Sequence, residues 1–387
     1  MSPAQRIALI SSSYHPYPGG VEEHTRNVAR VLAGRGVPVE VWTVDRGERL
    51  GVQSLDGVTV RYLPTPLPSM SPGGVWRFLA AFPGAARSWW SAYRRFRPDV
   101  LHVHCFGPNG VYADWLARAT RTPLALSAHG ETFMDEDDVF THSRLLRSAL
   151  VRGLRDADAV TGCSGAVIDD LTTRFGLAHG TVVPNGVDLS EAATLRGDVD
   201  GDGCRTPTVF AVGRMVPVKG FDLLLRAFAA ADLPRGTRLV LGGDGPERRR
   251  LEALAAELGI DEVVEFPGRL DRAGVVAGMA SADVVVVPSR IEAFGIVVLE
   301  AWRSGAALLC TNRGGPASFV RDGVDGLLVD PLDTPAVARA LGRLLTDPRL
   351  RAGLSRAGLV SVSAYTWEEV VDRYQAIYAA VSADASR

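Results

Sequence analysis

Two loops in the second half of the chain combine charged side chains with glycines. The first reads Gly213-Arg-Met-Val-Pro-Val-Lys-Gly and carries Arg214 and Lys219 between a strand-like and a helix-like run. Lysine and arginine together number 42, and Lys219 is the single lysine. A guanidinium and a compact ammonium at the mouth of a parallel sheet can neutralise a diphosphate without a metal ion. We therefore expect Arg214 and Lys219 to bind a diphosphate; an exposed pair beside a turn would contribute little.

The second loop begins at Pro288 and carries two glutamates in the pattern Glu-x7-Glu. Glu292 lies in the loop and Glu300 lies in the following helix, where carboxylates can accept hydrogen bonds from ribose or hexose hydroxyls. The backbone amides of Phe294, Gly295 and Ile296 open this helix and are suited to sugar or phosphate oxygens. The alternative is a capping Glu292 and an exposed Glu300, but the neighbours of Glu300 are apolar.

Loops of the first half supply further candidates. Gly19 and Gly20 precede a helix and would let backbone amides approach a phosphate, although a plain turn also explains them. His129 follows a strand in Ala128-His-Gly-Glu and is either part of a reaction centre or a histidine at the end of a core strand. Glu131, Asp135 and Asp137 follow it; they either contact a cationic acceptor or belong to a solvated acidic loop.

Strand-like and helix-like runs alternate along both halves. The expected strands are 6–12, 39–43, 58–63, 100–104, 124–128, 159–163, 181–183, 208–212, 238–242, 263–266, 283–288 and 307–311. The expected helices include 21–34, 75–96 with an interruption near Pro83, 220–231, 246–258, 272–281, 295–304 and 367–380. This alternation predicts an α/β protein with parallel sheets, whose ligands bind beyond the carboxyl ends of the strands.

A Gly- and Asp-rich segment without apolar periodicity separates the two halves. We predict a first Rossmann-like domain over residues 1–195, a linker over 196–207 and a second Rossmann-like domain over 208–365. The two doubly wound domains are expected to face a cleft.

The motifs and their order together resemble retaining glycosyltransferases of family 4, which have two Rossmann-like domains of the GT-B type. The resemblance rests on Gly-Arg-x4-Lys-Gly at 213–220, Gly-Asp-Gly-Pro at 243–246 and Glu-x7-Glu at 292–300. The segment Pro184-Asn-Gly-Val-Asp and the Gly19-Gly20 turn are similar to that family too. It implies that the last helix, within 366–387, crosses back to pack on the first domain.

The resemblance also implies roles for individual residues. Arg214 and Lys219 would bind the diphosphate of a nucleotide-sugar donor, and Glu300 would bind its ribose. Glu292 and the amides of residues 294–296 would hold the transferred sugar, with His129 near the reaction centre. Gly19 and Gly20 would approach the phosphates, and the loop at Gly268 and Arg269 would contact the base. The anomeric configuration would be retained, and no metal or other cofactor would be required.

Composition excludes several classes of function. The net charge of -2 lacks the basic excess of a nucleic-acid-binding protein. No signal peptide is recognisable, and no apolar stretch reaches the ~18 residues of a membrane helix. The four cysteines lie far apart and form no CxxC pair, which fits a reducing compartment. We therefore expect a cytoplasmic protein.

Other motifs are incomplete. A calcium-loop-like start at Asp198 would need a glutamate at residue 209, which is Val209. The pair Asp156 and Asp158 precedes a strand, where a metal-binding DxD is not expected. A pyridoxal phosphorylase needs a lysine for a Schiff base, but the single lysine, Lys219, is already assigned to the diphosphate. A dehydrogenase needs GxGxxG after the first strand, and this motif is absent there.

The segment 76–97 is rich in tryptophan and arginine. It is either an amphipathic helix on a membrane surface or a helix packed on the first sheet with its arginines outward. We favour the packed helix because Pro83-Gly84 is expected to break an amphipathic one.

The sequence thus predicts an enzyme that transfers hexose or N-acetylhexosamine from a UDP-sugar, UDP-glucose or UDP-N-acetylglucosamine, to an acceptor hydroxyl. The acceptor hypothesis is an aminocyclitol of an antibiotic pathway, because the arginine bias suggests a high-GC bacterium and amines suit the acidic loop. The alternatives are a GDP-mannose or other nucleotide-sugar transferase acting on lipid or polysaccharide, and a non-catalytic nucleotide-sugar-binding protein.

Overall fold

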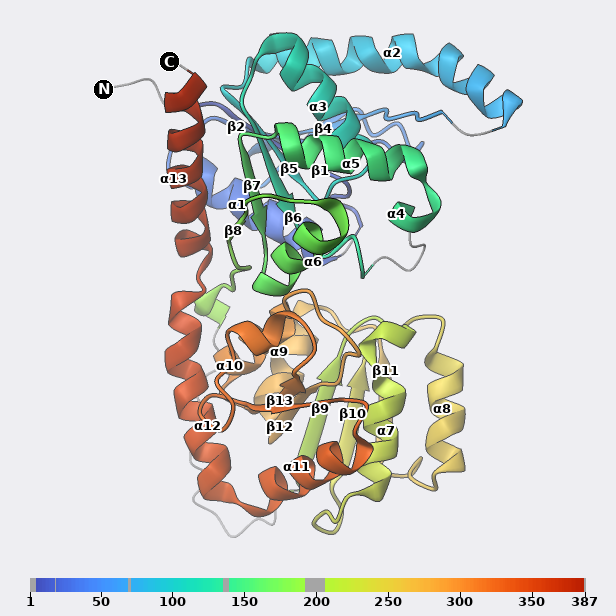
Figure 1. Ribbon diagram of the computed structural model, residues 1–387. Coiled ribbons are helices and arrows are strands. Elements are labelled where there is room, and N and C mark those ends of the chain that lie inside the picture. The colour runs from blue at the N-terminus through green and yellow to red at the C-terminus, as the bar shows by residue number, and fades with distance from the viewer. Residues whose placement is uncertain (1–4, 18, 69–70, 135–138, 192–205, 386–387) are drawn as a thin grey trace. The chain divides into compact units, whose positions relative to one another are not determined.

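The chain folds into two compact units. The computed structural model describes residues 5–17, 19–68, 71–134, 139–191 and 206–385. Unit 1 comprises residues 1–185 and 367–387, and unit 2 comprises residues 186–366. Each unit has one sheet of mainly parallel strands that are connected by helices (Figure 1). Both sheets agree with the α/β architecture expected from the sequence.

Unit 1 contains an eight-stranded sheet in the order β3-β4-β2-β1-β5-β6-β7-β8. Its strands are β1 (Ile7–Ser11), β2 (Val39–Val44), β3 (Val52–Leu55), β4 (Val58–Leu63), β5 (Val100–His104), β6 (Leu124–Ala128), β7 (Ala159–Gly162) and β8 (Thr181–Val182). All neighbours are parallel except β3 with β4. The strand order reverses between β1 and β5. Ligands of doubly wound sheets commonly bind at such a reversal, so the loops after these strands are candidate binding loops.

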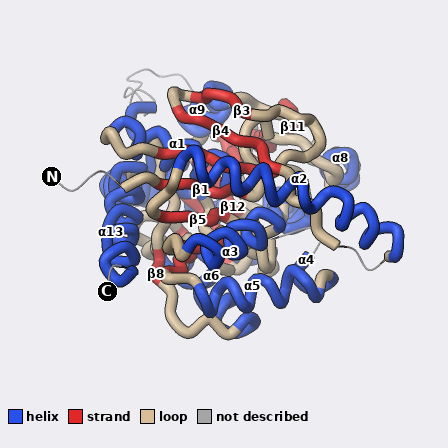
Figure 2. Tube along the Cα trace, turned by 90° about the horizontal axis from the view of Figure 1, so that it is seen from above, coloured by secondary structure: helices blue, strands red, loops and turns tan. Residues whose placement is uncertain are grey.

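Seven helices of the described residues belong to unit 1. They are α1 (Gly20–Gly34), α2 (Pro72–Phe96), α3 (Pro108–Thr120), α4 (Val139–His142), α5 (Arg144–Asp156), α6 (Gly165–Phe175) and α13 (Trp367–Ala385). Figure 2 shows α2 and α13 from a second direction. The last helix, α13, buries Val370, Val371, Tyr374 and Tyr378 in the same apolar core as Ile7 of β1. Its sequence position after unit 2 therefore does not prevent it from completing the first core.

The predicted interruption at Pro83 is wrong, because α2 is one continuous helix. Pro83 and Leu79, whose carbonyl group loses its helical partner, are both exposed, so water can replace that hydrogen bond. Buried Trp89 anchors the C-terminal half of the helix, and its indole N–H donates to the Pro64 carbonyl at 3.0 Å. At the other end, the Ser71 hydroxyl accepts a hydrogen bond from the Gly74 amide.

Unit 2 contains a six-stranded, all-parallel sheet in the order β11-β10-β9-β12-β13-β14. Its strands are β9 (Thr208–Val212), β10 (Arg238–Gly242), β11 (Val264–Gly268), β12 (Val284–Val287), β13 (Ala307–Thr311) and β14 (Leu327–Val329). This is the strand order of the dinucleotide-binding Rossmann fold. The reversal lies between β9 and β12, which precede the two charged loops singled out from the sequence.

Among the described residues unit 2 has six α-helices, of which the first four connect strands and the last two follow β14. They are α7 (Phe221–Ala230), α8 (Arg248–Glu257), α9 (Arg272–Ser281), α10 (Ile296–Ser304), α11 (Thr334–Thr346) and α12 (Pro348–Ser361), with short 3-10 turns η1 (Leu189–Glu191), η2 (Pro217–Lys219), η3 (Gly315–Ser318) and η4 (Val362–Ala364). Strands β3 and β14 were not predicted. β3 is largely exposed and β14 is only three residues long, so neither has a strong apolar pattern.

The chain passes from unit 1 to unit 2 at Asn185, earlier than the predicted domain end at residue 195. Residues 186–191 are therefore part of unit 2, and Arg303 of α10 holds them by donating to the Asp188 carbonyl at 2.9 Å. Most of the predicted linker, 196–207, lies outside the described residues. Among the described helices, none is long and apolar enough to cross a membrane.

The core of unit 1 contains a polar network between the sheet and α13. His102 on β5 contacts the hydroxyl groups of Tyr378 and Ser127, both at 2.7 Å. His24 on α1 contacts Asn185 at 2.7 Å and Tyr374 at 3.0 Å. Burial lowers the pKa of His24 to about 4, and burial with the nearby His24 lowers the pKa of His102 to about 3. Both imidazoles are therefore neutral at pH 7.

We expect acid to destabilise unit 1 selectively. Between the lowered pKa values and the ordinary value of 6.5, the unfolded chain binds more protons than the folded chain. The stability that neutral His24 and His102 provide is therefore complete above about pH 6.5. It is lost as the pH falls to about 4 for His24 and about 3 for His102, at roughly 1.4 kcal/mol per pH unit for each histidine. Hydrogen exchange, corrected for intrinsic rates, should show opening of β1 and β5 at acid pH before β9 and β12.

Two variants test the assignment. His102→Phe should flatten the pH dependence of unit 1 exchange even if it lowers stability at pH 7, whereas His179→Gln on the surface should leave that dependence unchanged. Equal pH slopes in His102→Phe and the wild type would contradict the prediction.

Candidate functional site

The charged loops of unit 2 meet at the reversal point of its sheet. The loop after β9 and the loop after β12 are joined by the Arg290 amide, which donates to the Val218 carbonyl at 2.8 Å. Gly220 adopts a left-handed conformation, with φ of 66°, and a Cβ atom there would overlap the Pro288 carbonyl oxygen. Only glycine permits this approach. The two loops therefore form one surface at the carboxyl end of the sheet.

Lys219 and Glu292, predicted for different parts of a ligand, form an ion pair. The Lys219 ammonium lies 2.7 Å from the Glu292 carboxylate, whose same oxygen accepts from the Ser289 hydroxyl at 3.0 Å. Glu292 is 9% exposed at its side chain, and Lys219 is 26% exposed. An ammonium has three donors, so the ion pair fixes Lys219 and leaves donor capacity for a ligand.

The segment 292–296 carries the backbone amides that the sequence analysis singled out. The Glu292 amide donates to the Arg313 carbonyl, and the Glu292 carbonyl accepts from the Gly315 amide, which fixes the segment from both sides. The amides of Phe294, Gly295 and Ile296 have no acceptor among the residues that the structure describes. They precede or begin α10, where the helix dipole favours an anionic or hydroxyl oxygen.

The other predicted donor-binding residues lie in or near the same end of the sheet. Arg214 is exposed in the loop after β9, and Glu300 is half-buried in α10. Gly268 ends β11 with φ of 81°, and Arg269 follows it with an exposed side chain. Strands β9 and β11 flank β10, so these residues share one sheet edge but come from different loops.

Two supporting interactions were not predicted. The Arg290 guanidinium binds the Asp222 carboxylate with two hydrogen bonds of 2.7 and 2.8 Å, tying the β12 loop to α7. This pair lowers the pKa of Asp222 against the opposing effect of burial. Gly314, with φ of 99°, lets the loop after β13 contact the Glu292 backbone. Arg290 and Asp222 lie far apart in sequence, so the sequence did not indicate that they pair. The only signal was that arginine can bind a carboxylate with two hydrogen bonds.

In unit 1, the candidate histidine is surrounded by other histidines. His129 follows β6, and its Nε2 lies 3.2 Å from Nδ1 of His104, the last residue of β5. The His24 ring lies 4.7 Å from the His129 ring, centroid to centroid. Burial and the neighbouring histidines hold the pKa of His104 and of His129 well below the ordinary value. His129 is therefore a neutral hydrogen-bonding group at pH 7.

The remaining unit 1 candidates divide into three cases. Gly19 and Gly20 are exposed at the start of α1, with the Gly19 carbonyl accepting from the Glu23 amide. Both Glu131 carboxylate oxygens accept backbone amides, of Phe106 at 2.8 Å and His129 at 2.7 Å. Burial raises the pKa of Glu131 despite these bonds. Asp135 and Asp137 lie outside the described residues.

Three histidines also have the composition of a metal site. Ring nitrogens of His24, His104 and His129 lie within 4.8 Å of one another. Both nitrogens of His24 are already hydrogen-bonded to Asn185 and Tyr374. A metal ion would have to displace one of these bonds, so the arrangement fits a hydrogen-bonded network better than a ligand set.

Family models match both halves of the chain. Residues 18–191 match the model described as "Glycosyltransferase Family 4", and residues 204–359 match "Glycosyl transferases group 1". Among solved structures, sucrose-phosphate synthase from Thermosynechococcus elongatus superposes with a TM-score of 0.79 at 24% identity, covering 98% of this chain and 100% of that one. Anabaena HepE in complex with UDP-glucose superposes with a TM-score of 0.74 at 21% identity, covering 98% and 100%.

Curated relatives align over nearly the whole chain. D-inositol 3-phosphate glycosyltransferase of Acidothermus cellulolyticus is 31% identical, over 97% of this chain and 90% of that protein. The protein of the same name from Geodermatophilus obscurus is 33% identical, over 98% and 90%. The family models, the relatives and the two Rossmann-like units agree. The chain therefore belongs to the family 4 glycosyltransferases of GT-B fold.

Proposed function

We propose that this glycosyltransferase moves a hexose or N-acetylhexosamine from a UDP-sugar to a hydroxyl group of a cyclitol, with retention of anomeric configuration and without a metal ion. The observation that carries the proposal is the position of Lys219, whose ammonium is fixed by Glu292 at the reversal point of the unit 2 sheet. The UDP assignment is supported by the UDP and UDP-glucose complexes of the structural neighbour HepE.

Charge stabilisation of the leaving group is the main chemical task. As the bond between the sugar C1 and the phosphate oxygen breaks, negative charge grows on the departing UDP. Lys219 and Arg214 lie in one loop and would stabilise that charge. Because their positions are fixed beforehand, they need not reorganise during the reaction. In the proposed front-face reaction, the acceptor oxygen bonds to C1 while its proton passes to the departing phosphate.

The sugar would be held by backbone amides that have no acceptor among the described residues and by a carboxylate oxygen of Glu292. The amides of Phe294, Gly295 and Ile296 can donate to sugar or phosphate oxygens. Glu292 can accept from a sugar hydroxyl through its second oxygen, because its Oε2 binds Lys219 and Ser289. Glu300 would bind the ribose. The ion pair therefore connects recognition of the sugar to the group that stabilises the diphosphate.

His129 would act as a neutral hydrogen-bonding group beside the reacting sugar or acceptor. Its pKa lies well below 6.5 because burial and neighbouring histidines disfavour the charged ring. It therefore needs no change of charge between pH 6 and 8, and activity in that range should not follow a histidine titration.

The cyclitol assignment is supported by the curated relatives, which are named D-inositol 3-phosphate glycosyltransferase. An aminocyclitol acceptor of antibiotic biosynthesis is the second candidate, favoured by the acidic sequence at residues 135–138. A phosphorylated cyclitol and an amine-bearing cyclitol carry opposite charges. A single panel of acceptors can therefore distinguish the two candidate acceptors. A cytoplasmic location stays a prediction from the sequence.

Lys219→Ala should lower kcat/KM by at least about 10²–10³, the typical loss when a preorganised charge-stabilising donor is removed. Lys219→Arg should recover part of the rate, because charge is kept but the planar guanidinium cannot reproduce the compact ammonium. UDP release in the presence of acceptor measures both.

Arg226→Ala, an exposed arginine of the neighbouring α7, is the matched control and should keep wild-type activity. Thermal melting must show that each variant is folded. A folded Lys219→Ala enzyme with the wild-type kcat/KM would contradict the assignment of the leaving-group site.

A donor and acceptor panel tests the substrates. UDP-glucose, UDP-N-acetylglucosamine and GDP-mannose would each be combined with inositol 3-phosphate, inositol and 2-deoxystreptamine, and the products identified by mass spectrometry and NMR. We expect transfer from a UDP-sugar to a cyclitol, an α-linked product from an α-linked donor, and no loss of rate with EDTA.

Each part of the proposal has its own contrary result. Transfer only from GDP-mannose would overturn the donor assignment, and an inverted linkage would overturn retention. Loss of turnover with EDTA, restored by a divalent ion, would overturn metal independence. Donor binding without product from any acceptor, lipid or polysaccharide included, would favour a binding protein.

A further inference from the structure

One helix of unit 1, α2, carries large apolar side chains and arginines that are exposed to solvent. The chain has seven tryptophans. Four of them, Trp42, Trp89, Trp302 and Trp367, are at most 2% exposed. The other three are exposed by 74% at Trp76, 39% at Trp90 and 37% at Trp115, and they lie on α2 and its neighbour α3. Exposed tryptophan is therefore confined to one surface.

The exposed apolar side chains of α2 follow helical spacing. Val75, Leu79, Phe82 and Trp90 are separated by four, three and eight residues, so they share one face of the helix. Trp76 extends that face. The stretch from 75 to 90 is about 22 Å long at ~1.5 Å per residue. The absence of a break at Pro83 makes this stripe continuous.

Exposed arginines lie on the same helix as the apolar stripe. At about 100° per residue, Arg87 and Arg94 adjoin the stripe, whereas Arg77 and Arg95 project from another side of the helix. Arg77, Arg87, Arg94 and Arg95 on α2 and Arg97 directly after it are all exposed. Helix α2 contains no aspartate or glutamate, and none of the five arginines has an ion-pair partner among the described residues. Asp114 lies on the neighbouring helix α3, but it forms ion pairs with Arg118 and Arg152 and not with the arginines of α2.

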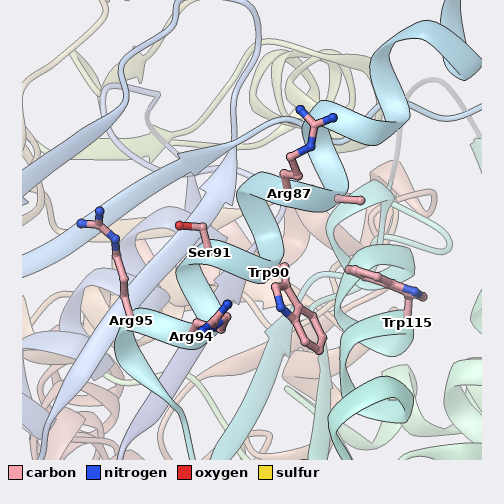
Figure 3. A pocket seen from close by; sticks show the side chains of 7 residues that line it. Arg87, Trp90, Ser91, Arg94, Arg95 and Trp115 are labelled. Atoms are coloured by element: carbon pink, nitrogen blue, oxygen red, sulfur yellow. The ribbon is translucent and has the colours of Figure 1, made fainter.

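Aromatic and basic side chains gather at the junction of α2 and α3. Figure 3 shows Trp90 beside Trp115, with Arg87 and Arg94 on the same helix as Trp90. The two indole rings lie 6.4 Å apart, centroid to centroid. Indole rings favour the boundary between headgroups and acyl chains, and arginine stems can lie along apolar surface while their guanidinium groups contact phosphates.

We propose that the exposed face of α2, with Trp115 of α3, binds the surface of an anionic lipid bilayer, α2 lying in the interface plane. Charge selects this occupant over a second copy of the chain. Pairing two such faces would bring unpaired arginines of like charge together, whereas anionic headgroups neutralise them. An apolar stripe with cationic side chains next to it and on the polar side of the helix is the pattern of a helix that lies on a membrane.

Vesicle co-sedimentation tests the proposal with the full-length enzyme. We expect binding to phosphatidylcholine vesicles that contain phosphatidylglycerol, little binding to phosphatidylcholine alone, and a blue shift of tryptophan emission on binding. The triple variant Arg87→Gln/Arg94→Gln/Arg95→Gln should lower the partition coefficient by at least about tenfold. Trp76→Ser/Leu79→Ser should lower it by a similar factor, because two exposed apolar side chains are lost.

The matched control removes equal charge elsewhere. Arg226→Gln/Arg339→Gln/Arg349→Gln replaces three exposed arginines of unit 2 and should bind vesicles like the wild type. Circular dichroism and soluble-substrate turnover should be unchanged in all variants. Equal binding to neutral vesicles, an equal loss in the control, or no binding to anionic vesicles would overturn the proposal. So would a wild-type dimer that Trp76→Ser/Leu79→Ser converts to a monomer.

Discussion

The close approach of the loops after β9 and β12 is the constraint on which the unit 2 site depends. Gly220 allows it because any Cβ atom would overlap the Pro288 carbonyl oxygen. The approach brings Lys219 within 2.7 Å of Glu292, although 73 residues separate them. Arg290, bound to Asp222, secures the same contact from the other side. A parallel sheet supplies the shared edge, and glycine determines how near its loops can come.

In unit 1 the candidate histidine, His129, lies in a buried polar network. His24, His102 and His104 are buried, and hydroxyl groups from α13 satisfy His24 and His102. Neutral imidazoles avoid the cost of buried charge, but they make the network sensitive to acid. The last helix therefore contributes to the environment of a residue that precedes it by more than two hundred positions. Removing α13 would expose both the apolar core and the histidines.

Glu131 and Glu292 show how a carboxylate can fix backbone amides or a cation within the protein. Glu131 accepts two amides and so fixes the turns after β5 and β6. Glu292 pairs with the one ammonium side chain of the protein. A buried charge that lost such a partner would be strongly destabilising, so these contacts restrict which conformations the loops adopt.

The sequence by itself determined the alternating α/β pattern, several strands to the residue and the loops that carry Arg214, Lys219, Glu292 and His129, because apolar periodicity and strand-to-helix turns are local signals. It did not reveal the continuity of α2 through Pro83, the edge strand β3 or the contact between Lys219 and Glu292. Those depended on which surfaces are exposed and which loops meet. Local residue patterns specify an element, but burial and the packing of distant elements decide whether a helix survives a proline and which charges become partners.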